Sequence, residues 1–185
     1  MRDELGQALL ILARNTIAWQ LGEAPVPKTL PETEPPELRQ PGACFVTLTL
    51  DGKLRGCIGS LEARRPLDED IRANATASAF RDPRFPPLTR DEFARLRIEV
   101  SLLTQPQPMS FTGEEDALAQ LRPGIDGVIF EQGNHRSTFL PQVWEDLPDP
   151  SQFLAQLKIK AGLPRGFWSA ELKLSRYQVE KWKEP

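Results

Sequence analysis

The sequence predicts an α+β fold, in which antiparallel sheets pack with helices. Two strong hairpin signals, Asp51-Gly52 and Gly133-Asn134, each lie between apolar strand patterns. Apolar residues recur at helical spacing in separate segments, the first of which covers residues 3–21. Strands and helices do not alternate regularly, as they would in a parallel βαβ sheet. Hairpins that pack with helices are therefore the expected architecture.

Composition limits both the size of the fold and the kinds of partner. The 185 residues suit one domain or two closely joined subdomains. The net charge of −3 lacks the basic excess typical of nucleic-acid binding. No stretch approaches the roughly 20 apolar residues of a membrane span. We therefore expect neither nucleic acid nor membrane as a partner. The chain opens on an amphipathic pattern rather than a secretory signal and has two cysteines, which favours a reducing, cytoplasmic location.

The first half of the chain predicts a helix, a connection, a hairpin and a second helix. The first helix, residues 3–21, has an apolar stripe of Leu5, Leu9, Leu12, Ala13, Thr16 and Trp19. Residues 23–41 are rich in proline and glutamate and indicate a long exposed connection. Residues 43–61 form the hairpin. The second helix begins at Pro66 and ends near Arg81, because the next residue precedes a proline.

The register of this first hairpin separates an apolar face from a polar one. If Leu50 pairs with Leu54, the apolar face carries Val46, Leu48, Leu50, Leu54 and Ile58. The opposite face then carries Thr47, Thr49, Arg55 and Cys57. Cys44 lies on the apolar face, where a disulfide to Cys57 would have poor geometry. We predict two free thiols, of which Cys44 is structural and Cys57 faces a polar surface or cleft.

The second half of the chain alternates short strands with short helices. We expect a strand at 96–104, a helix at 114–121, strands at 127–130 and 136–140, a helix at 150–161, and one or two final strands over 172–179. The strand at 96–104 has one apolar face, and its other face carries Glu99 and Ser101. These two side chains could line the same cleft as Thr47 and Thr49, with Glu99 as a base or a ligand-binding group. A solvated strand face is the alternative.

The stretch Leu54-Arg55-Gly56-Cys57-Ile58-Gly59 contains the leading candidate for catalysis. Residues two apart on a strand share a face, so Arg55 should lie beside Cys57 and favour its thiolate. Glycines inside a strand mark a place where another group approaches the backbone, so Gly56 and Gly59 are candidate binding positions. A buried, inert Cys57 is the structural alternative.

Two further residues are open to more than one interpretation. Arg84 lies in the stiff run Pro83-Arg84-Phe85-Pro86-Pro87, which is either a packing corner or a preset anion contact. His135, the single histidine, is expected at an exposed hairpin turn, and its role as a catalytic partner stays open. With one histidine and no close cysteine pair, we expect no metal site. The sequence shows no phosphate-binding loop and predicts no cofactor.

Several blocks of the chain resemble one family in the same order. They are the LRGCIG stretch at 54–59, Asp82-Pro83-Arg84-Phe85-Pro86-Pro87-Leu88, Asp126-Gly127-Val128, Phe139-Leu140-Pro141-Gln142-Val143 and Lys160-Ala161-Gly162-Leu163. Together they resemble the AMMECR domain family over nearly the whole chain. The resemblance implies a single domain over residues 1–185 with two subdomains, each with an antiparallel sheet and helices. The larger subdomain would hold both termini, and the LRGCIG strand would face a cleft between the two.

The resemblance also implies a functional context. Bacterial and archaeal relatives are encoded with, or fused to, a Memo-like protein and a radical S-adenosylmethionine protein, which suggests a shared modification pathway. This chain has no three-cysteine iron–sulfur motif, so it is not the radical component. The family's KAGL block often follows a cysteine, but residues 157–160 contain none, so a mechanism that needs that second thiol is doubtful here.

Two hypotheses of function follow from the sequence. In the first, the chain is an enzyme or enzyme component with Cys57 and Arg55 in the cleft between the subdomains. In the second, it is an adaptor that binds a peptide or partner protein, for example by strand addition at Gly56 and Gly59. An enzyme should need the thiol or guanidinium, whereas an adaptor should tolerate Cys57→Ser and fail on Gly56→Val.

Overall fold

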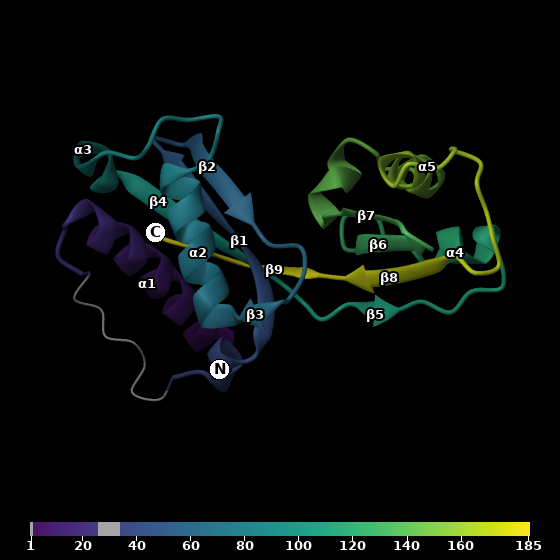
Figure 1. Cartoon of the computed structure of the whole chain (residues 1–185), viewed down its shortest axis with the longest axis horizontal. Helices are drawn as coiled ribbons and strands as arrows, with labels where there is room; N and C mark the ends of the chain where they lie inside the picture. Colours follow the sequence, from purple (N-terminus) through teal and green to yellow (C-terminus); the bar gives the residue numbers. More distant parts are fainter. Residues whose placement is uncertain (1, 26–33) are drawn as a thin grey trace. The chain divides into compact units, whose positions relative to one another are not determined.

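The computed structural model describes residues 2–25 and 34–185 and divides the chain into two compact units (Figure 1). Unit 1 contains residues 1–103 and 180–185, and unit 2 contains residues 104–179. Each unit has its own antiparallel sheet, helices and hydrophobic core, so the α+β prediction is confirmed. The predicted cleft between subdomains stays a prediction.

Unit 1 consists of a sheet with two long helices on one of its faces. The strands are β1 (Pro41–Leu50), β2 (Lys53–Gly59), β3 (Arg65–Pro66), β4 (Leu96–Leu103) and β9 (Val179–Lys183). Their order is β2-β1-β4-β9, and β3 pairs with β1. The helices are α1 (Arg2–Leu21), η1 (Pro36–Arg39), α2 (Leu67–Phe80) and α3 (Arg90–Phe93). Helices α1 and α2 lie side by side, and α2 packs on β1 and β2 (Figure 1).

The core of unit 1 lies between these helices and the sheet. The predicted stripe of α1 is correct at Leu5, Leu9, Leu12 and Ala13, which are all buried. It is wrong at Trp19, which is 81% exposed. Four-residue spacing from Ala13 leads to the fully buried Ile17, so the stripe continues there and leaves Trp19 on the outer side of the helix.

The connection before the first hairpin is only partly described. Of the predicted segment 23–41, residues 26–33 lie outside the described residues. In the part after them, the short helix η1 inserts Leu38 into the core, where it is 1% exposed. The prediction of an exposed connection is therefore wrong at Leu38.

The C-terminal segment completes unit 1. Strand β9 pairs with β4, and the amide of Glu184 donates to the carbonyl of Ile98 over 3.0 Å. The Glu184 carboxylate also accepts hydrogen bonds from both Nε and Nη2 of Arg14 on α1, each 2.5 Å long. Helix α1 and the sheet are therefore joined through residues from opposite ends of the sequence.

The β1–β2 hairpin contains a β-bulge that the sequence did not predict. Asp51 (φ 51°) and Gly52 (φ 79°) form a two-residue turn with left-handed backbone at both positions, so Leu50 pairs with Lys53. The predicted pairing of Leu50 with Leu54 is therefore wrong, and Leu54 is 44% exposed rather than buried. The register shift lies between Leu48 and Thr49.

Beyond the bulge the predicted register is correct. Leu48 pairs with Gly56, Thr47 with Cys57 and Val46 with Ile58. Arg55 is the extra, unpaired residue of the bulge on β2. Beyond it, the pairs of facing residues are those that the sequence predicted. Cys44 and Cys57 are both free, as predicted.

Unit 2 is a smaller sheet packed with helices. Its strands are β5 (Gln107–Pro108), β6 (Gly127–Gln132), β7 (His135–Phe139) and β8 (Lys173–Tyr177), in the order β5-β8-β6-β7. Its helices are α4 (Glu114–Gln120), η2 (Pro141–Glu145) and α5 (Pro150–Lys160). The hairpin around Gly133-Asn134 is confirmed. Stacked rings of Trp144 and Phe153, with centroids 3.7 Å apart, lie in the core. Among the described residues, no helix is long and apolar enough to span a membrane.

Gly56 is required by the close approach of α2 to β2. A Cβ atom at this position would lie 2.2 Å from the carbonyl oxygen of Ser78. The Ser78 hydroxyl donates to the Val46 carbonyl over 2.8 Å and accepts from the Ile58 amide over 2.9 Å. The helix therefore bonds directly to both strands of the hairpin, and no side chain fits between them.

We expect Gly56→Ala to lower the free energy of unfolding by about 1–3 kcal/mol, because the helix backbone must move to admit the methyl group. Urea denaturation measures this loss. Gly166→Ala is the control, since nothing lies within 4 Å of a Cβ there and φ is not left-handed. Equal midpoints for wild type and Gly56→Ala would contradict the packing argument.

Candidate functional site

The polar face of the unit 1 sheet brings several of the predicted residues together. Thr47 on β1 pairs with Cys57 on one side and with Glu99 on the other, so the three residues form a row across three strands. The Sγ atom of Cys57 lies 3.3 Å from Oγ1 of Thr47, and either atom can donate the hydrogen bond. Cys57 is partly exposed. The thiol therefore belongs to a partly exposed residue and is hydrogen-bonded to a hydroxyl.

The neighbouring rows contain the other predicted polar positions. Phe45 pairs with Gly59 and with Ser101, so those residues form the next row on the same face. A Cβ atom on Gly59 would lie 2.2 Å from the Phe45 ring, so packing within the hairpin explains why this position is a glycine. Thr49 lies nearer the turn, where it pairs with Leu54 and Arg97. The space beside Gly56 and Gly59 is therefore occupied by this chain itself.

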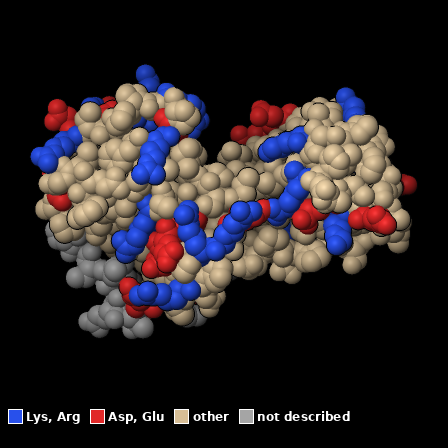
Figure 2. Space-filling view, viewed as in Figure 1, with Lys and Arg blue, Asp and Glu red and all other residues tan. Residues whose placement is uncertain are grey.

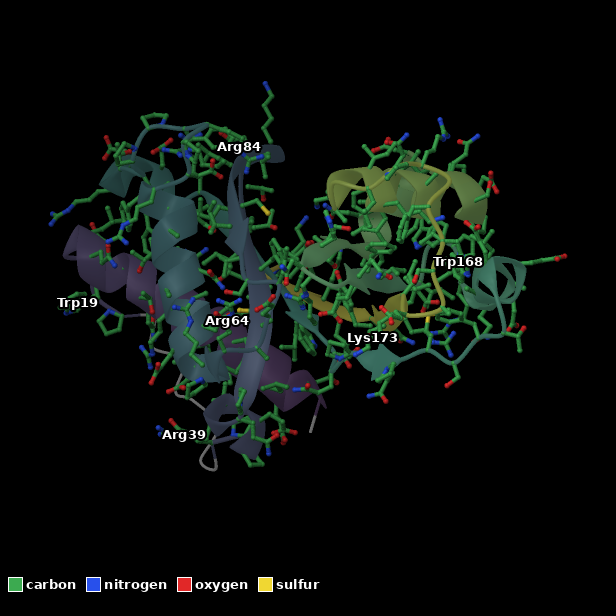
Figure 3. The ribbon with its side chains drawn as sticks, turned by 45° about the vertical axis from the view of Figure 1, so that its right-hand side comes forward. Trp19, Arg39, Arg64, Arg84, Trp168 and Lys173 are labelled. Atoms are coloured by element: carbon green, nitrogen blue, oxygen red, sulfur yellow. The ribbon has the colours of Figure 1, made fainter. Side chains whose placement is uncertain are left out.

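The backbone of Cys57 is held by the loop that follows α2. Its amide donates to Oδ2 of Asp82 over 2.9 Å, and its carbonyl accepts from Nη2 of Arg84 over 3.2 Å. Nη2 of Arg84 also binds the Asp82 carboxylate, 2.7 Å away. Hydrogen bonding from Arg84 holds the pKa of the buried Asp82 far below its usual range, with a smaller contribution from the Cys57 amide. The pair thus stays ionised and fixes the strand at the cysteine (Figure 3 labels Arg84).

Arg84 is the cation that contacts Cys57, through the backbone carbonyl of that residue. Its pKa is raised, chiefly by the hydrogen bond to Asp82 and in smaller part by the charge of Cys57. The Arg84 side chain is 53% exposed, so its remaining donors reach solvent. This arginine lies in the stiff proline loop that the sequence singled out.

Arg55 makes different contacts from those expected. It is 7% exposed, and its Nε and Nη2 donate to the two carboxylate oxygens of Glu92, 2.9 and 3.1 Å away. Nη2 also donates to the Pro86 carbonyl, and the guanidinium lies 5.8 Å from the ring centre of Phe85. Its third nitrogen, Nη1, is buried without a hydrogen-bond partner in the described part of the chain. Its charge is therefore paired with Glu92.

Glu92 links Arg55 to the start of α3. Its Oε2 accepts from the amide and the hydroxyl of Thr89, which completes a capping box. The hydrogen bond from Arg55 lowers the pKa of Glu92 to about 2, and the bonds from Thr89 act in the same direction. Arg55 thereby fixes the loop that carries Phe85 and Arg84.

Cys44 lies on the other face of β1 in a buried polar network. Oδ2 of Asp70 accepts hydrogen bonds from the Cys44 amide and thiol, 3.0 and 3.3 Å away, and from Nδ2 of Asn74 at 2.9 Å. Burial raises the pKa of the Cys44 thiol, and the Asp70 charge adds to the increase. This cysteine is therefore structural, as its position in the hairpin predicts.

Sequence reasoning missed the polar side of α2 and the loop after it. Asp70, Asn74, Ser78 and Asp82 are buried, and each binds the β1–β2 hairpin. Their regular spacing of four residues was the available signal, since residues four apart share a helix face. The Thr89-x-x-Glu92 spacing likewise indicated a capping box.

His135 belongs to unit 2, at the start of β7. Its side chain is exposed, and Nδ1 lies 2.9 Å from the carbonyl oxygen of Ala161. Among the described residues, no cluster of three or more His, Cys, Asp or Glu side chains could hold a metal ion.

The ion pair of Glu92 with Arg55 should make stability depend on pH. The folded pKa of about 2 lies below the usual value near 4.3, so this stabilisation is complete above about pH 5 and is lost as the pH falls towards 2. We expect Glu92→Gln to reduce the free energy of unfolding by about 2–3 kcal/mol at pH 7 and by progressively less below pH 5. Denaturation over this pH range tests it, with the exposed Asp91→Asn as control. If the difference in unfolding free energy between wild type and Glu92→Gln stayed the same at every pH, the ion pair would not be the source of this stability.

Comparison with known proteins identifies the family. The AMMECR1 family model matches residues 10–182. A protein of Methanothermobacter thermautotrophicus is 38% identical over 99% of this chain and 95% of its own length, and protein MJ0810 of Methanocaldococcus jannaschii is 36% identical over 95% and 92%. The crystal structure of the uncharacterized protein PH0010 from Pyrococcus horikoshii is similar with a TM-score of 0.74, at 35% identity over 98% of this chain and 92% of that one. The chain belongs to the AMMECR1 family.

Proposed function

We propose that this protein is an enzyme, or a component of one, that uses Cys57 as a nucleophile. The observation that carries the proposal is the contrast between the two sides of this residue. Its backbone is fixed by Asp82 and Arg84, while the residue is partly exposed and its thiol is hydrogen-bonded to Thr47. A thiol on a fixed backbone, in a partly exposed residue and beside a hydroxyl, is suited to attack an electrophile.

Each neighbouring residue has a distinct role in this proposal. Arg84 fixes the backbone carbonyl of Cys57, and the Thr47 hydroxyl lies within hydrogen-bonding distance of the sulfur, where it can donate to it. Glu99, with Thr49 nearer the turn, supplies polar groups for a substrate on the same sheet face, whereas Ser101 is 8% exposed and offers little surface. Arg55 acts through the loop that it holds, and so supports the site without touching the sulfur.

Binding of a peptide by strand addition at the motif is less compatible with the geometry. An added strand needs free amide and carbonyl groups along the edge of β2. At Cys57 both groups are already bonded within the chain. Because α2 occupies the space beside Gly56, Gly56→Val would also damage an enzyme and cannot separate the two hypotheses.

Family context extends the proposal to partners. The AMMECR resemblance supports a modification pathway shared with a Memo-like protein and a radical S-adenosylmethionine protein, in which this chain performs a thiol-dependent step or presents the substrate. Such a step requires reduced cysteines, so we place it in the cytoplasm.

An activated ester tests the nucleophile. With p-nitrophenyl acetate, the Cys57 sulfur forms a bond to the acetyl carbon, the ester bond breaks and p-nitrophenolate leaves; water then hydrolyses the thioester. We expect a burst of p-nitrophenolate and an acetyl group on Cys57 by mass spectrometry, both absent in Cys57→Ser. Cys44→Ser, at the buried thiol, should keep both if it folds. Absence of acetylation at Cys57 in the native protein would refute the proposal.

The Thr47 hydroxyl should affect the rate of this reaction. Loss of one hydrogen bond to the thiolate is worth about 0.5–1.5 kcal/mol, so Thr47→Val should slow acetylation of Cys57 by about three- to tenfold. Thr76→Val is the control, because this threonine lies on α2 outside the site and its hydroxyl accepts a hydrogen bond from Gln20, and it should react at the wild-type rate. Equal rates for the two variants would exclude a role for Thr47.

A further inference from the structure

A ridge of side chains runs along the outer face of α1 at four-residue spacing. This α1 ridge consists of Gln7, Ile11, Asn15, Trp19 and, just beyond the helix, Glu23. Residues four apart lie on one face of a helix, so the ridge is about 24 Å long. At 81%, Trp19 is the most exposed large apolar side chain of the described residues, and Figure 3 shows it on the outside of unit 1. The core of unit 1 therefore leaves this ridge at the surface.

Two hollows border the α1 ridge. The Leu10 hollow, of about 300 Å³, lies between α1 and the C-terminal segment and is lined by Gln7, Leu10, Ile11, Arg14, Lys183, Glu184 and Pro185. The Arg72 hollow, of about 450 Å³, lies between α1 and α2 and is lined by Asn15, Thr16, Trp19, Gln20, Glu23, Pro25 and Arg72. The same helix therefore has an exposed indole in its second half and an open hollow with aliphatic side chains in its first half.

The indole and the Leu10 hollow are complementary when two copies of the chain meet on a two-fold axis. In such a contact the same surface is used twice, so that each residue meets its counterpart in both directions. If two α1 ridges run antiparallel with Asn15 near the axis, Trp19 of each copy lies over Ile11 of the other, at the Leu10 hollow. Aligning rows of four-residue spacing crosses the helices at about −50°, the commonest class of helix packing. One arrangement therefore places both indoles.

Charges at the two ends of the α1 ridge match in the same arrangement. Glu23 lines the Arg72 hollow with Trp19, whereas Lys183 lines the Leu10 hollow with Gln7. Antiparallel ridges bring Glu23 of one copy to Lys183 of the other. Lys183 is exposed and makes no ion pair within the described part of the chain. The Glu23 side chain is 40% exposed and lies 3.8 Å from Arg90, so it still has a free side for a second cation.

The wider surface of unit 1 does not favour a strongly charged partner. Blue and red side chains lie next to one another on the face of unit 1 in Figure 2. With 26 acidic and 23 basic residues, the net charge of the chain is only −3. A nucleic acid would meet no basic field here. A second copy with the same mixed charges would meet little repulsion.

We propose that unit 1 binds a second copy of this chain through the α1 ridge, with Trp19 of each copy seated in the Leu10 hollow of the other. Two buried indoles account for about 300–500 Å² of surface. A standard interface buries roughly 1,200–2,000 Å², so side chains of α1, α2 and the C-terminal segment supply the rest. The dimer is therefore weak and forms with rising concentration. It is independent of the chemistry proposed at Cys57.

Sedimentation velocity on the full chain over a concentration series tests the dimer. We expect a reversible monomer–dimer equilibrium, and we expect Trp19→Ala to weaken it about tenfold or more, because a central tryptophan carries much of the energy of an interface. Leu61→Ala is the matched control, since Leu61 is an exposed apolar residue (41%) that lines neither hollow. A wild type that stays monomeric up to about 1 mM, or equal dimerisation of Trp19→Ala, would overturn the proposal.

Reversal of the two charges tests the antiparallel arrangement. Glu23→Lys and Lys183→Glu should each weaken the dimer about two- to fivefold, because each places like charges together across the axis. The double variant restores unlike charges and should dimerise like the wild type. All three changes are at exposed side chains, so the monomer should fold in each case. A double variant that is no tighter than the single ones would show that the two ends do not meet, and would overturn this dimer.

Discussion

The rest of unit 1 depends on the way helix α2 binds the β1–β2 hairpin through buried polar groups. Asp70, Asn74 and Ser78 lie four residues apart on the helix and bind backbone groups of Cys44 and Val46. A buried polar group is tolerated only when it is hydrogen-bonded, so each of these contacts fixes one position of the helix along the strands. Burial of the apolar residues of α2 supplies much of the driving force for packing. The buried polar residues fix the position of the helix along the strands.

The candidate site follows from this register. Asp82 continues the four-residue spacing just beyond the helix, which brings its carboxylate to the Cys57 amide. The loop after it then returns Arg84 to the carbonyl of the same residue. The position of the thiol is therefore set by the end of α2 as much as by the strand that carries it.

Much of the fold was predictable because its signals are local. Turn residues at Asp51-Gly52 and alternation in residues 96–104 depend on neighbours in sequence, and both predictions are correct. The bulge at Arg55 was not predictable, because it depends on how the turn and the helix each fix one end of β2. The same holds for Trp19, whose exposure depends on where the core ends.

The site was only partly predictable for a related reason. Placing Thr47 and Cys57 on one face needed only the strand period, and the structure joins them by a hydrogen bond. The partner of Arg55 could not be found that way, since Glu92 lies 37 residues further along the chain. Spacing along a strand shows which side chains share a face, but a long arginine takes the nearest carboxylate that the tertiary fold provides.

The use of residues 180–185 in unit 1 has a consequence for synthesis on the ribosome. Unit 2 is encoded without interruption, whereas the unit 1 sheet lacks β9 and the Arg14–Glu184 ion pair until residues 180–185 are made. During translation, β4 therefore has an unpaired edge for the whole time that unit 2 is being synthesised. The order of translation thus requires that the unit 1 sheet is completed only after unit 2 has been synthesised.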